Sequence, residues 1–208
     1  MNEKYIAIID YNIGNIKSVS NAFTKISARV KVTSSPKIIR NACAIVLPGV
    51  GAFGDGMKNL EFFNLVGCLK SEIKNKPFLG ICLGLQVLFE YSKENGSTEG
   101  LGIFKGHVDR IPGGVKIPHI GWNQVNIIKK NSVIFNGIQD RENFYFAHSY
   151  YVICEDEKII SGTTEYGGAL TASVEKENIF TLQFHPEKSS FKGLKVLENF
   201  WNYSIKEG

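Results

Sequence analysis

The sequence predicts an α/β fold with an open, mostly parallel sheet flanked by helices and additional mixed or antiparallel strands in the second half. In the first half, short apolar runs alternate with segments of helical periodicity, which is the pattern of βαβ units. From about residue 106 to 184 the chain instead shows short β-rich runs separated by glycine, asparagine and charged residues. Neither a low-complexity linker nor an internal repeat is present, so we expect one domain over residues 1–208.

The first half is expected to contain four strands, with helical segments after the first, the third and the fourth. The strands are expected at residues 5–9, 29–33, 43–47 and 78–81, and the helices at residues 16–26, 57–63, 65–73 and 83–91. The first strand ends at Asp10, the third is closed by Pro48-Gly49, and Pro77 introduces the fourth.

The second half is expected to add strands at the edge of this parallel core. The β-rich runs are residues 107–111, 124–128, 144–146, 150–153, 158–163, 170–174 and 179–184. A final amphipathic helix is expected over residues 191–201, with Glu198 on its polar edge.

Composition narrows the class of protein. The apolar fraction of 43% and the charged fraction of 21% are ordinary for a soluble globular chain. A net charge of +4, spread along the sequence, does not favour a nucleic-acid partner. The apolar runs are shorter than the roughly 20 residues of a membrane-spanning helix, and no secretory signal is evident. We therefore expect no nucleic-acid or membrane partner, and a cytoplasmic protein with free thiols.

The stretch around Cys82 is the most informative one for chemistry. An apolar strand runs into Gly80-Ile81-Cys82-Leu83-Gly84, and helix-forming residues follow, which is the cysteine version of a nucleophile elbow. The tight turn needs small neighbours, and a helix N-terminus favours thiolate and leaves the N–H of Leu83 free to face an oxyanion. A core cysteine is the alternative, but the flanking glycines favour a nucleophile.

A second stretch, residues 183–187, supplies a base for such a nucleophile. His185 could accept the thiol proton, and Glu187 could orient the imidazole, because residues two apart in an extended segment face the same side. Pro186 keeps His185 extended. A lone His-x-Glu is more often a surface pair, so this prediction depends on its combination with the elbow.

A third stretch is the glycine-rich turn of residues 47–54. It can be a plain connector, and it lacks the form of a phosphate loop. It can also offer a second backbone N–H to an oxyanion. Because ligand sites of open α/β sheets lie beyond the carboxyl ends of the strands, strands ending at Leu47, Ile81 and Phe184 would bring the three stretches to one edge.

Taken together, these motifs resemble the class I glutamine amidotransferases of the triad type, and within them the glutaminase subunits of histidine biosynthesis. The resemblance covers essentially the whole chain, and its motifs are residues 10–15, 48–53, 80–86, 118–123 and 148–151. One departure is Asn12, where many relatives carry glycine.

The resemblance implies a reaction and a set of roles. Cys82 would attack the side-chain amide of L-glutamine and release ammonia, with His185 as base and then acid and Glu187 as its orienter. The backbone N–H groups assigned to the oxyanion are those of Val50, Gly51 and Leu83. The residues assigned to the substrate are Gly49, Gln86, Ser149 and Tyr150. No cofactor and no metal are implied.

The resemblance also implies a partner, a (β/α)₈-barrel cyclase that forms a heterodimer with the glutaminase and receives its ammonia. The residues that would face it are Asn15, Trp122, Tyr145 and Lys188. A solvated lysine and a core aromatic are the alternatives for Lys188 and Trp122. A length of 208 residues holds one glutaminase domain, so we expect the ammonia acceptor on another chain.

Two other functions are alternatives. A paralogous glutaminase would keep the chemistry but supply ammonia for amidino-sugar biosynthesis, and the sequence does not separate this from the histidine pathway. A catalytically silent regulatory partner is disfavoured because Cys82, His185 and Glu187 are all present. We expect Cys43, Cys68 and Cys154 to be packing residues. His107 and His119 lack metal-ligand companions, and His148 has either a packing or a binding role.

Overall fold

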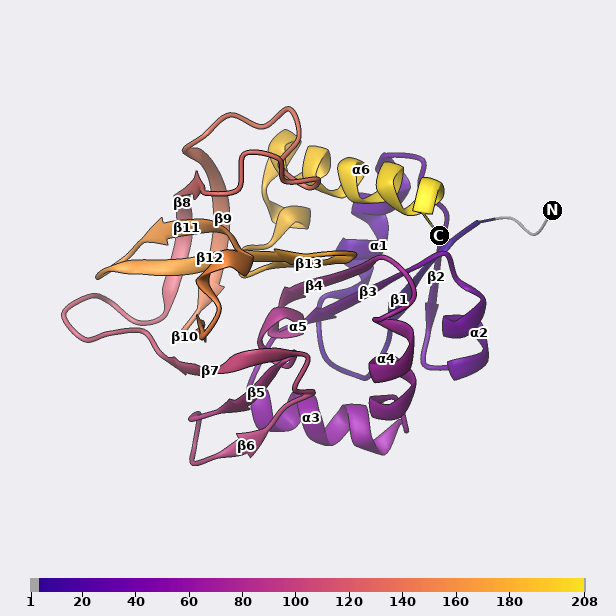
Figure 1. The fold of residues 1–208 in the computed structure, drawn as a ribbon, viewed down its shortest axis with the longest axis horizontal. Helices are drawn as coiled ribbons and strands as arrows, with labels where there is room; N and C mark the ends of the chain where they lie inside the picture. Colours follow the sequence, from indigo (N-terminus) through magenta and orange to yellow (C-terminus); the bar gives the residue numbers. More distant parts are fainter. Residues whose placement is uncertain (1–3, 208) are drawn as a thin grey trace.

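The computed structural model describes residues 4–207, so the ends of the expected domain, residues 1–3 and 208, lie outside this description. The described chain has the α/β architecture that the sequence predicts (Figure 1). One sheet has nine strands in the order β2-β1-β3-β4-β13-β12-β11-β8-β9, and a second has four in the order β10-β7-β5-β6. No helix within residues 4–207 is long and apolar enough to cross a membrane.

The parallel half of the large sheet carries the helices. Its strands are β1 (Ile6–Ile9), β2 (Val30–Thr33), β3 (Ala44–Gly49), β4 (Phe78–Cys82) and β13 (Ile179–Leu182). All neighbouring pairs among them are parallel. The helices are α1 (Ile16–Lys25), α2 (Pro36–Asn41), α3 (Phe53–Phe62), α4 (Val66–Glu72) and α6 (Ser190–Glu207).

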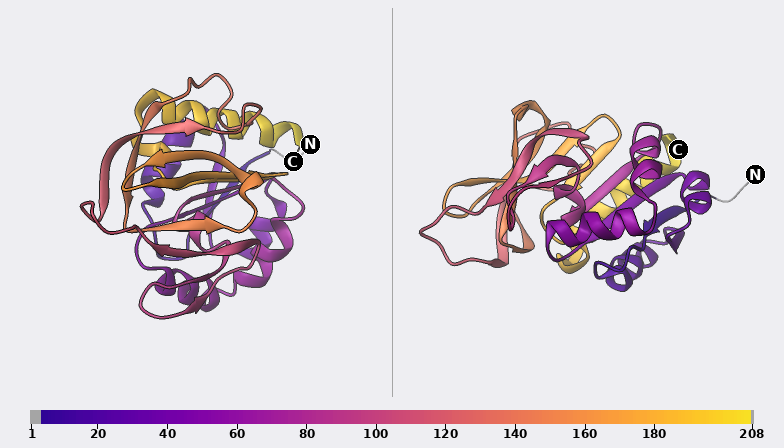
Figure 2. Two further views of the ribbon diagram at one scale, coloured as in Figure 1. Left: turned by 60° about the vertical axis from the view of Figure 1, so that its left-hand side comes forward. Right: turned by 90° about the horizontal axis from the view of Figure 1, so that it is seen from below.

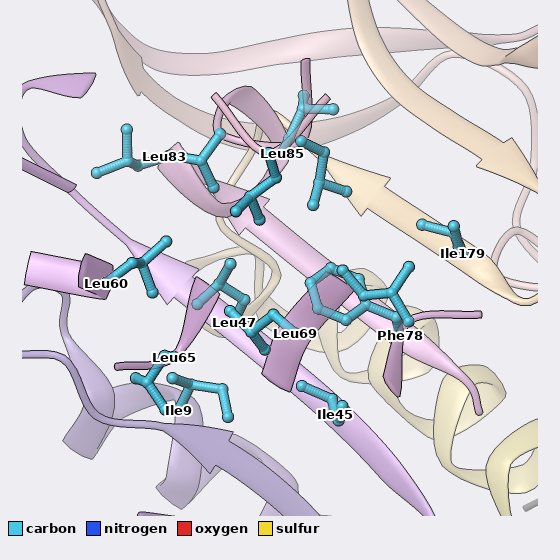
Figure 3. Close-up of a cluster of buried hydrophobic side chains, with 14 of the residues drawn as sticks. Ile9, Ile45, Leu47, Leu60, Leu65, Leu69, Phe78, Leu83, Leu85 and Ile179 are labelled. Carbon is cyan, nitrogen blue, oxygen red and sulfur yellow. The ribbon is translucent and has the colours of Figure 1, made fainter. Parts of the chain in front are cut away.

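Alternation along these strands produces two cores, one on each face of the sheet. Ile9, Ile45, Leu47 and Phe78 point to one face, where they cluster with leucines of α3 and α4 (Figure 3). The strand residues between them pack on the other face against α1 and α6. A sheet buried on both faces explains why its strands appear in the sequence as continuous apolar runs.

The second half extends the sheet with antiparallel strands, as predicted. These are β12 (Ala169–Lys176), β11 (Ile160–Glu165), β8 (His119–Ile127) and β9 (Glu142–His148). The smaller sheet consists of β5 (Phe89–Ser92), β6 (Thr98–Glu99), β7 (Phe104–Arg110) and β10 (Tyr150–Cys154). Short 3₁₀ turns lie at η1 (Glu157–Ile159) and η2 (Pro186–Lys188). The β-rich part occupies one end of the molecule and the helices the other (Figure 2).

The helix predicted over residues 83–91 is wrong beyond its first turn. Helix α5 spans only Leu83–Gln86, after which the chain turns and enters β5. The main-chain carbonyl groups of residues 87–89 instead accept hydrogen bonds from the N–H groups of residues 101–104, and the buried Phe89 ring lies 5.7 Å from that of Phe104. Tertiary pairing therefore outweighs local helix propensity here. The short α2 and β6 were not predicted from the sequence.

Candidate active site

The three stretches that the sequence singles out end on adjacent parallel strands. Gly49 at the end of β3 pairs with Cys82 at the end of β4, and Leu182 at the end of β13 pairs with Ile81. The carboxyl ends of these strands lie at one edge of the sheet, and they bring the glycine-rich turn, the cysteine and the His185 segment to that edge.

Cys82 has the backbone conformation of a nucleophile elbow. Its φ of 55° and ψ of −106° are strained for a residue with a side chain, and Leu83 directly after it begins α5. A side chain on Gly84 would collide with the carbonyl oxygen of Leu47, and one on Gly80 would lie 2.5 Å from the carbonyl oxygen of Gly84. The structure thus explains why glycine flanks Cys82 on both sides.

His185 and Glu187 form a buried pair beside the cysteine. Nδ1 of His185 lies 2.9 Å from Oε1 of Glu187, and the two side chains are 3% and 1% exposed. Burial lowers the pKa of His185, but the Cys82 sulfur and the Glu187 carboxylate outweigh it and raise the pKa to about 10. Nε2 makes no conventional hydrogen bond within the described residues. This nitrogen is therefore available for proton exchange with the neighbouring sulfur.

A cavity of about 290 Å³ opens beside Cys82. It is lined by Gly51, Cys82, Leu83, Gln86, Glu94, Pro118, Ile120, Ala147, His148, Ser149 and Tyr150. A larger hollow of about 610 Å³ lies between residues 130–138 and α6 and is lined mostly by lysines, asparagines and other polar residues, with no thiol or histidine among them. The chemistry therefore singles out the smaller cavity.

Most predicted substrate and oxyanion residues lie at this cavity, although not all of them line it. Gly51, with a φ of 113°, is part of the lining, whereas Gly49 is buried beneath Leu83 and Val50 is 41% exposed. The oxyanion roles remain predictions. Asn12, which departs from the family pattern, adopts a φ of 62° that glycine or asparagine tolerates best.

Glu94 is the residue of this cavity that the sequence reasoning missed. Its carboxylate Oε2 accepts a hydrogen bond of 2.7 Å from the backbone N–H of Phe53, and the residue lines the cavity with Cys82. It reaches this place because the chain folds back through β5, where a continuing helix was expected. No motif around Glu94 signals that return.

Three of the four residues predicted to face a partner form one group. The rings of Trp122 and Tyr145 meet edge to face at 6.1 Å, and Nζ of Lys188 lies 5.6 Å from the centre of the Tyr145 ring. Trp122 is 55% exposed and is thus not a core aromatic. Asn15 caps α1 instead, where its side chain accepts a hydrogen bond from the N–H of Ser18.

His119 and His148 form a second imidazole centre at the cavity. Nδ1 of His119 lies 3.0 Å from Nε2 of His148, and Nδ1 of His148 lies 2.9 Å from the carbonyl oxygen of Tyr150. Burial lowers the pKa of both histidines to about 4. Both are therefore neutral at physiological pH, and His148, whose role the sequence leaves open, combines packing with a place in the cavity wall.

The other three thiols lie away from this cavity. Cys43 and Cys68 are buried, Cys154 is partly buried, and all four cysteines are unpaired. Burial raises the pKa of Cys43 and Cys68, and it raises the pKa of Cys154 to about 12. These three thiols are therefore protonated at neutral pH, which agrees with a packing role.

Comparison with known proteins places this geometry in a family. The family model described as Glutamine amidotransferase class-I matches residues 7–202. The imidazole glycerol phosphate synthase subunit HisH of Aquifex aeolicus is 53% identical over 195 residues, which cover 93% of this chain and 94% of that protein. The HisH subunit of Methanothermobacter thermautotrophicus is 51% identical, over 94% of this chain and 96% of that protein.

Solved structures show the same fold at much lower identity. PurLQS from Thermotoga maritima is 19% identical and superposes with a TM-score of 0.74 over 97% of this chain and 99% of that chain. The glutaminase domain of CTPS from Trypanosoma brucei is 17% identical, with a TM-score of 0.72 over 99% and 95% of the two chains. With the family model and the close relatives matching nearly its whole length, the chain belongs to the class-I glutamine amidotransferases.

Proposed function

We propose that the chain is the glutaminase subunit of an imidazole glycerol phosphate synthase. It hydrolyses L-glutamine to glutamate and ammonia and passes the ammonia to a (β/α)₈-barrel cyclase that makes imidazole glycerol phosphate and AICAR. The observation that carries the chemistry is the strained Cys82 elbow beside the buried His185–Glu187 pair. The names of relatives that are 53% and 51% identical support the assignment to this synthase.

The proposal includes the organisation and the setting of the chain. We infer one amidotransferase domain over residues 1–208, supported by a family match over residues 7–202. We also infer a cytoplasmic protein, in keeping with unpaired thiols and with a biosynthetic role. The steps described below use the groups of this chain and water, and no cofactor or metal takes part in them.

In the first step the Cys82 thiolate attacks the side-chain amide carbon of glutamine. A carbon–sulfur bond forms, and the carbonyl electron pair moves to the oxygen. The backbone N–H groups of Val50 or Gly51 and of Leu83 would stabilise that oxyanion. Removal of one such donor typically costs about 3–4 kcal/mol of transition-state stabilisation.

Collapse of this intermediate releases ammonia and leaves a thioester on Cys82. The imidazolium of His185 gives its Nε2 proton to the departing nitrogen, which agrees with its raised pKa. A water molecule then attacks the thioester, His185 takes up the water proton, and glutamate leaves as the thiolate returns. Glu187 holds the Nδ1 proton of His185 throughout and stabilises the imidazolium.

The cavity offers complementary groups for the α-carbon end of glutamine. The carboxylate of Glu94 fits the α-ammonium group. Gln86 donates from Nε2 to Tyr150 and Gln183, so its carbonyl oxygen is the group that remains for this ammonium. Ser149 and Tyr150 would receive the α-carboxylate, and Gly49 shapes the turn below the cavity.

The group formed by Trp122, Tyr145 and Lys188 would contact the cyclase. Trp122 and its neighbour Ile120 are 55% and 61% exposed, and Ile120 also lines the cavity. An apolar partner surface placed over them would cover the cavity mouth, as direct transfer of ammonia requires. Asn15 belongs to the proposed interface only through the family resemblance.

The test is to mix the protein with the histidine-pathway cyclase and its ligand and to measure glutamate release. Stimulation of glutamine hydrolysis is expected, together with formation of a heterodimer. In the complex, Cys82→Ala should abolish the glutamine-dependent reaction and leave synthesis from ammonium salts intact. Absence of stimulation would reject the histidine-pathway assignment in favour of the amidino-sugar alternative, and glutamine-dependent activity near wild type in Cys82→Ala would reject the nucleophile.

A further inference from the structure

A continuous set of hydrogen bonds runs through the interior from β8 to the sulfur of Cys82. Its links are Asn123 Nδ2 to His119 Nε2 (3.2 Å), His119 Nδ1 to His148 Nε2 (3.0 Å), His148 Nδ1 to the Tyr150 carbonyl (2.9 Å), Gln86 Nε2 to the same carbonyl (2.9 Å), Gln86 Nε2 to Gln183 Oε1 (3.1 Å) and Gln183 Nε2 to Cys82 Sγ (3.6 Å). Gln183 stands outside the roles that the sequence motifs assign.

The main-chain carbonyl of Tyr150 determines the direction of every link, because a carbonyl oxygen only accepts hydrogen bonds. On one side, His148 must carry its proton on Nδ1, so its Nε2 accepts from His119. On the other side, Gln86 must present its NH₂ group to Tyr150, and its second hydrogen then goes to Oε1 of Gln183. One fixed acceptor thus orients two imidazoles and two amides.

The consequence for Cys82 concerns which end of the Gln183 amide faces it. With Oε1 occupied by Gln86, the Gln183 NH₂ group points at Sγ. A donor beside the sulfur favours the thiolate, whereas a carbonyl oxygen in the same place would disfavour it. Gln183 is fully buried, and Gln86 is 5% exposed, so water does not compete strongly for these groups.

We propose that Gln183 is a positioning residue that donates a hydrogen bond to the Cys82 sulfur, and that Gln86 clamps its amide in the donating orientation. The proposal rests on the proposed function only in taking Cys82 as the nucleophile. Two other titratable groups, His185 and Tyr11, interact electrostatically with Cys82. The Tyr11 hydroxyl has no hydrogen-bond partner among the described residues.

The main-chain N–H of Gln183 bonds to the carbonyl of Ala172 at 2.8 Å, and this bond does not involve the side chain. Gln183→Met keeps the length of the side chain and removes the donor. Gln183→Glu keeps its shape and places a carboxylate near the sulfur. Gln86→Met leaves Gln183 in place but frees its amide to turn. Gln124→Met, at an exposed glutamine of β8, is the matched control.

The primary measurement is the rate at which iodoacetamide alkylates Cys82 as a function of pH, followed by peptide mass spectrometry so that the other three thiols are counted separately. We expect the midpoint of the profile to rise by about one pH unit in Gln183→Met, with an about tenfold lower rate below the midpoint. Gln183→Glu should raise this midpoint further, Gln86→Met should raise it less, and Gln124→Met should leave it unchanged.

A second readout separates positioning from a general structural defect. Gln183 does not line the cavity, so Gln183→Met in the complex should lower kcat for glutamine hydrolysis and leave KM unchanged. A Gln183→Met profile that coincides with wild type would overturn the proposal. If that variant does not fold, a wild-type profile in Gln86→Met would overturn it instead.

Failure of the proposed function has a different signature. If Cys82→Ala retained glutamine hydrolysis, the nucleophile assignment would fall whatever the alkylation profiles show. If Cys82→Ala is inactive but the alkylation profiles of the glutamine variants match wild type, the proposed function stands, and the role of Gln183 is rejected.

Discussion

Two buried histidine centres lie near the cavity that Cys82 lines, and their pKa values are shifted in opposite directions. In one, His185 pairs with the carboxylate of Glu187 and has a pKa raised to about 10. In the other, His119 and His148 pair with each other and have pKa values lowered to about 4. The three histidines are all 6% exposed or less.

The comparison shows that burial alone does not decide the charge of an imidazole. Removal from water disfavours the imidazolium in both centres. A carboxylate and a sulfur reverse that effect at His185, whereas a neutral imidazole and a main-chain carbonyl next to His148 do not. The first centre is therefore suited to move protons, and the second is suited to hold groups in place without exchanging them.

The largest expected effect comes from making the first centre resemble the second. Glu187→Gln keeps the shape of the side chain but removes its charge, so the pKa of His185 should fall. The tautomer of His185 that carries its proton on Nδ1 should also no longer be favoured. Glutamine hydrolysis in the complex should decrease by about 10³–10⁴-fold, as for neutralised orienting carboxylates in triads. The measurement is glutamate release at saturating glutamine.

Glu142→Gln is the matched control for that substitution. Glu142 is also a carboxylate in an ion pair, with Lys192 at 2.5 Å, but it lies away from the cavity lining. The glutaminase activity of the Glu142→Gln variant should stay within about twofold of wild type, since surface ion pairs contribute little to stability. A loss of less than tenfold in Glu187→Gln would show that the carboxylate is not needed to orient His185.

The next effect is a pH dependence of unfolding that differs between the two centres. An unfolded histidine has a pKa near 6.5. For His119 and His148 the folded state binds fewer protons than the unfolded state between pH 6.5 and 4, so their contribution is complete above 6.5 and is lost as the pH falls through 4. For His185 the contribution is complete below 6.5 and is lost as the pH rises through 10.

Urea unfolding between pH 4 and pH 10 measures this difference. Moving the pKa of His148 from 6.5 to about 4 corresponds to about 3 kcal/mol at neutral pH. His148→Gln should therefore flatten the acid side of the stability profile, and His185→Asn should flatten the alkaline side. If either variant flattens the opposite side, the assignment of charge to the two centres is wrong.

The first centre was predictable from the sequence because its signals are local. The glycines around Cys82 are two residues away from it, and His185 and Glu187 are two residues apart on an extended segment. The order of the parallel strands then brings these segments together by the general rule for strand ends. The α/β class and most of the parallel core followed from equally local apolar runs.

The second centre was not predictable because it depends on strand register. His119 and His148 lie opposite each other only through the pairing of β8 with β9, and the strands expected at residues 124–128 and 144–146 are too short to contain either residue. The position of Glu94 at the cavity depends on the turn of the chain into β5, which tertiary pairing imposes against helix propensity. Long-range pairings of this kind leave no periodic signal in the sequence.

The smallest expected effect concerns the side chains that exclude water from His119 in the second centre. The ring of Tyr166 stacks on His119 at 3.9 Å, and Phe146 stacks on it at 4.8 Å. Tyr166→Leu removes both the stack and the hydrogen bond of the hydroxyl, so it should lower the free energy of unfolding at pH 7 by about 1–3 kcal/mol. Water would then reach His119, so its pKa should rise toward 6.5, which histidine NMR titration detects.

Tyr166→Phe separates the ring from its hydroxyl, which donates to the carbonyl of Lys116 at 2.6 Å. This variant keeps the stack, so the pKa of His119 should remain near 4, and stability should fall only by the value of one hydrogen bond, about 0.5–1.5 kcal/mol. If the pKa of His119 rises as much in Tyr166→Phe as in Tyr166→Leu, then the hydrogen bond from the Tyr166 hydroxyl to Lys116, and not the stacked ring, excludes water from His119. The neutral state of the second centre would then depend on the Tyr166–Lys116 hydrogen bond, and the contrast with His185 would have its origin outside the cavity.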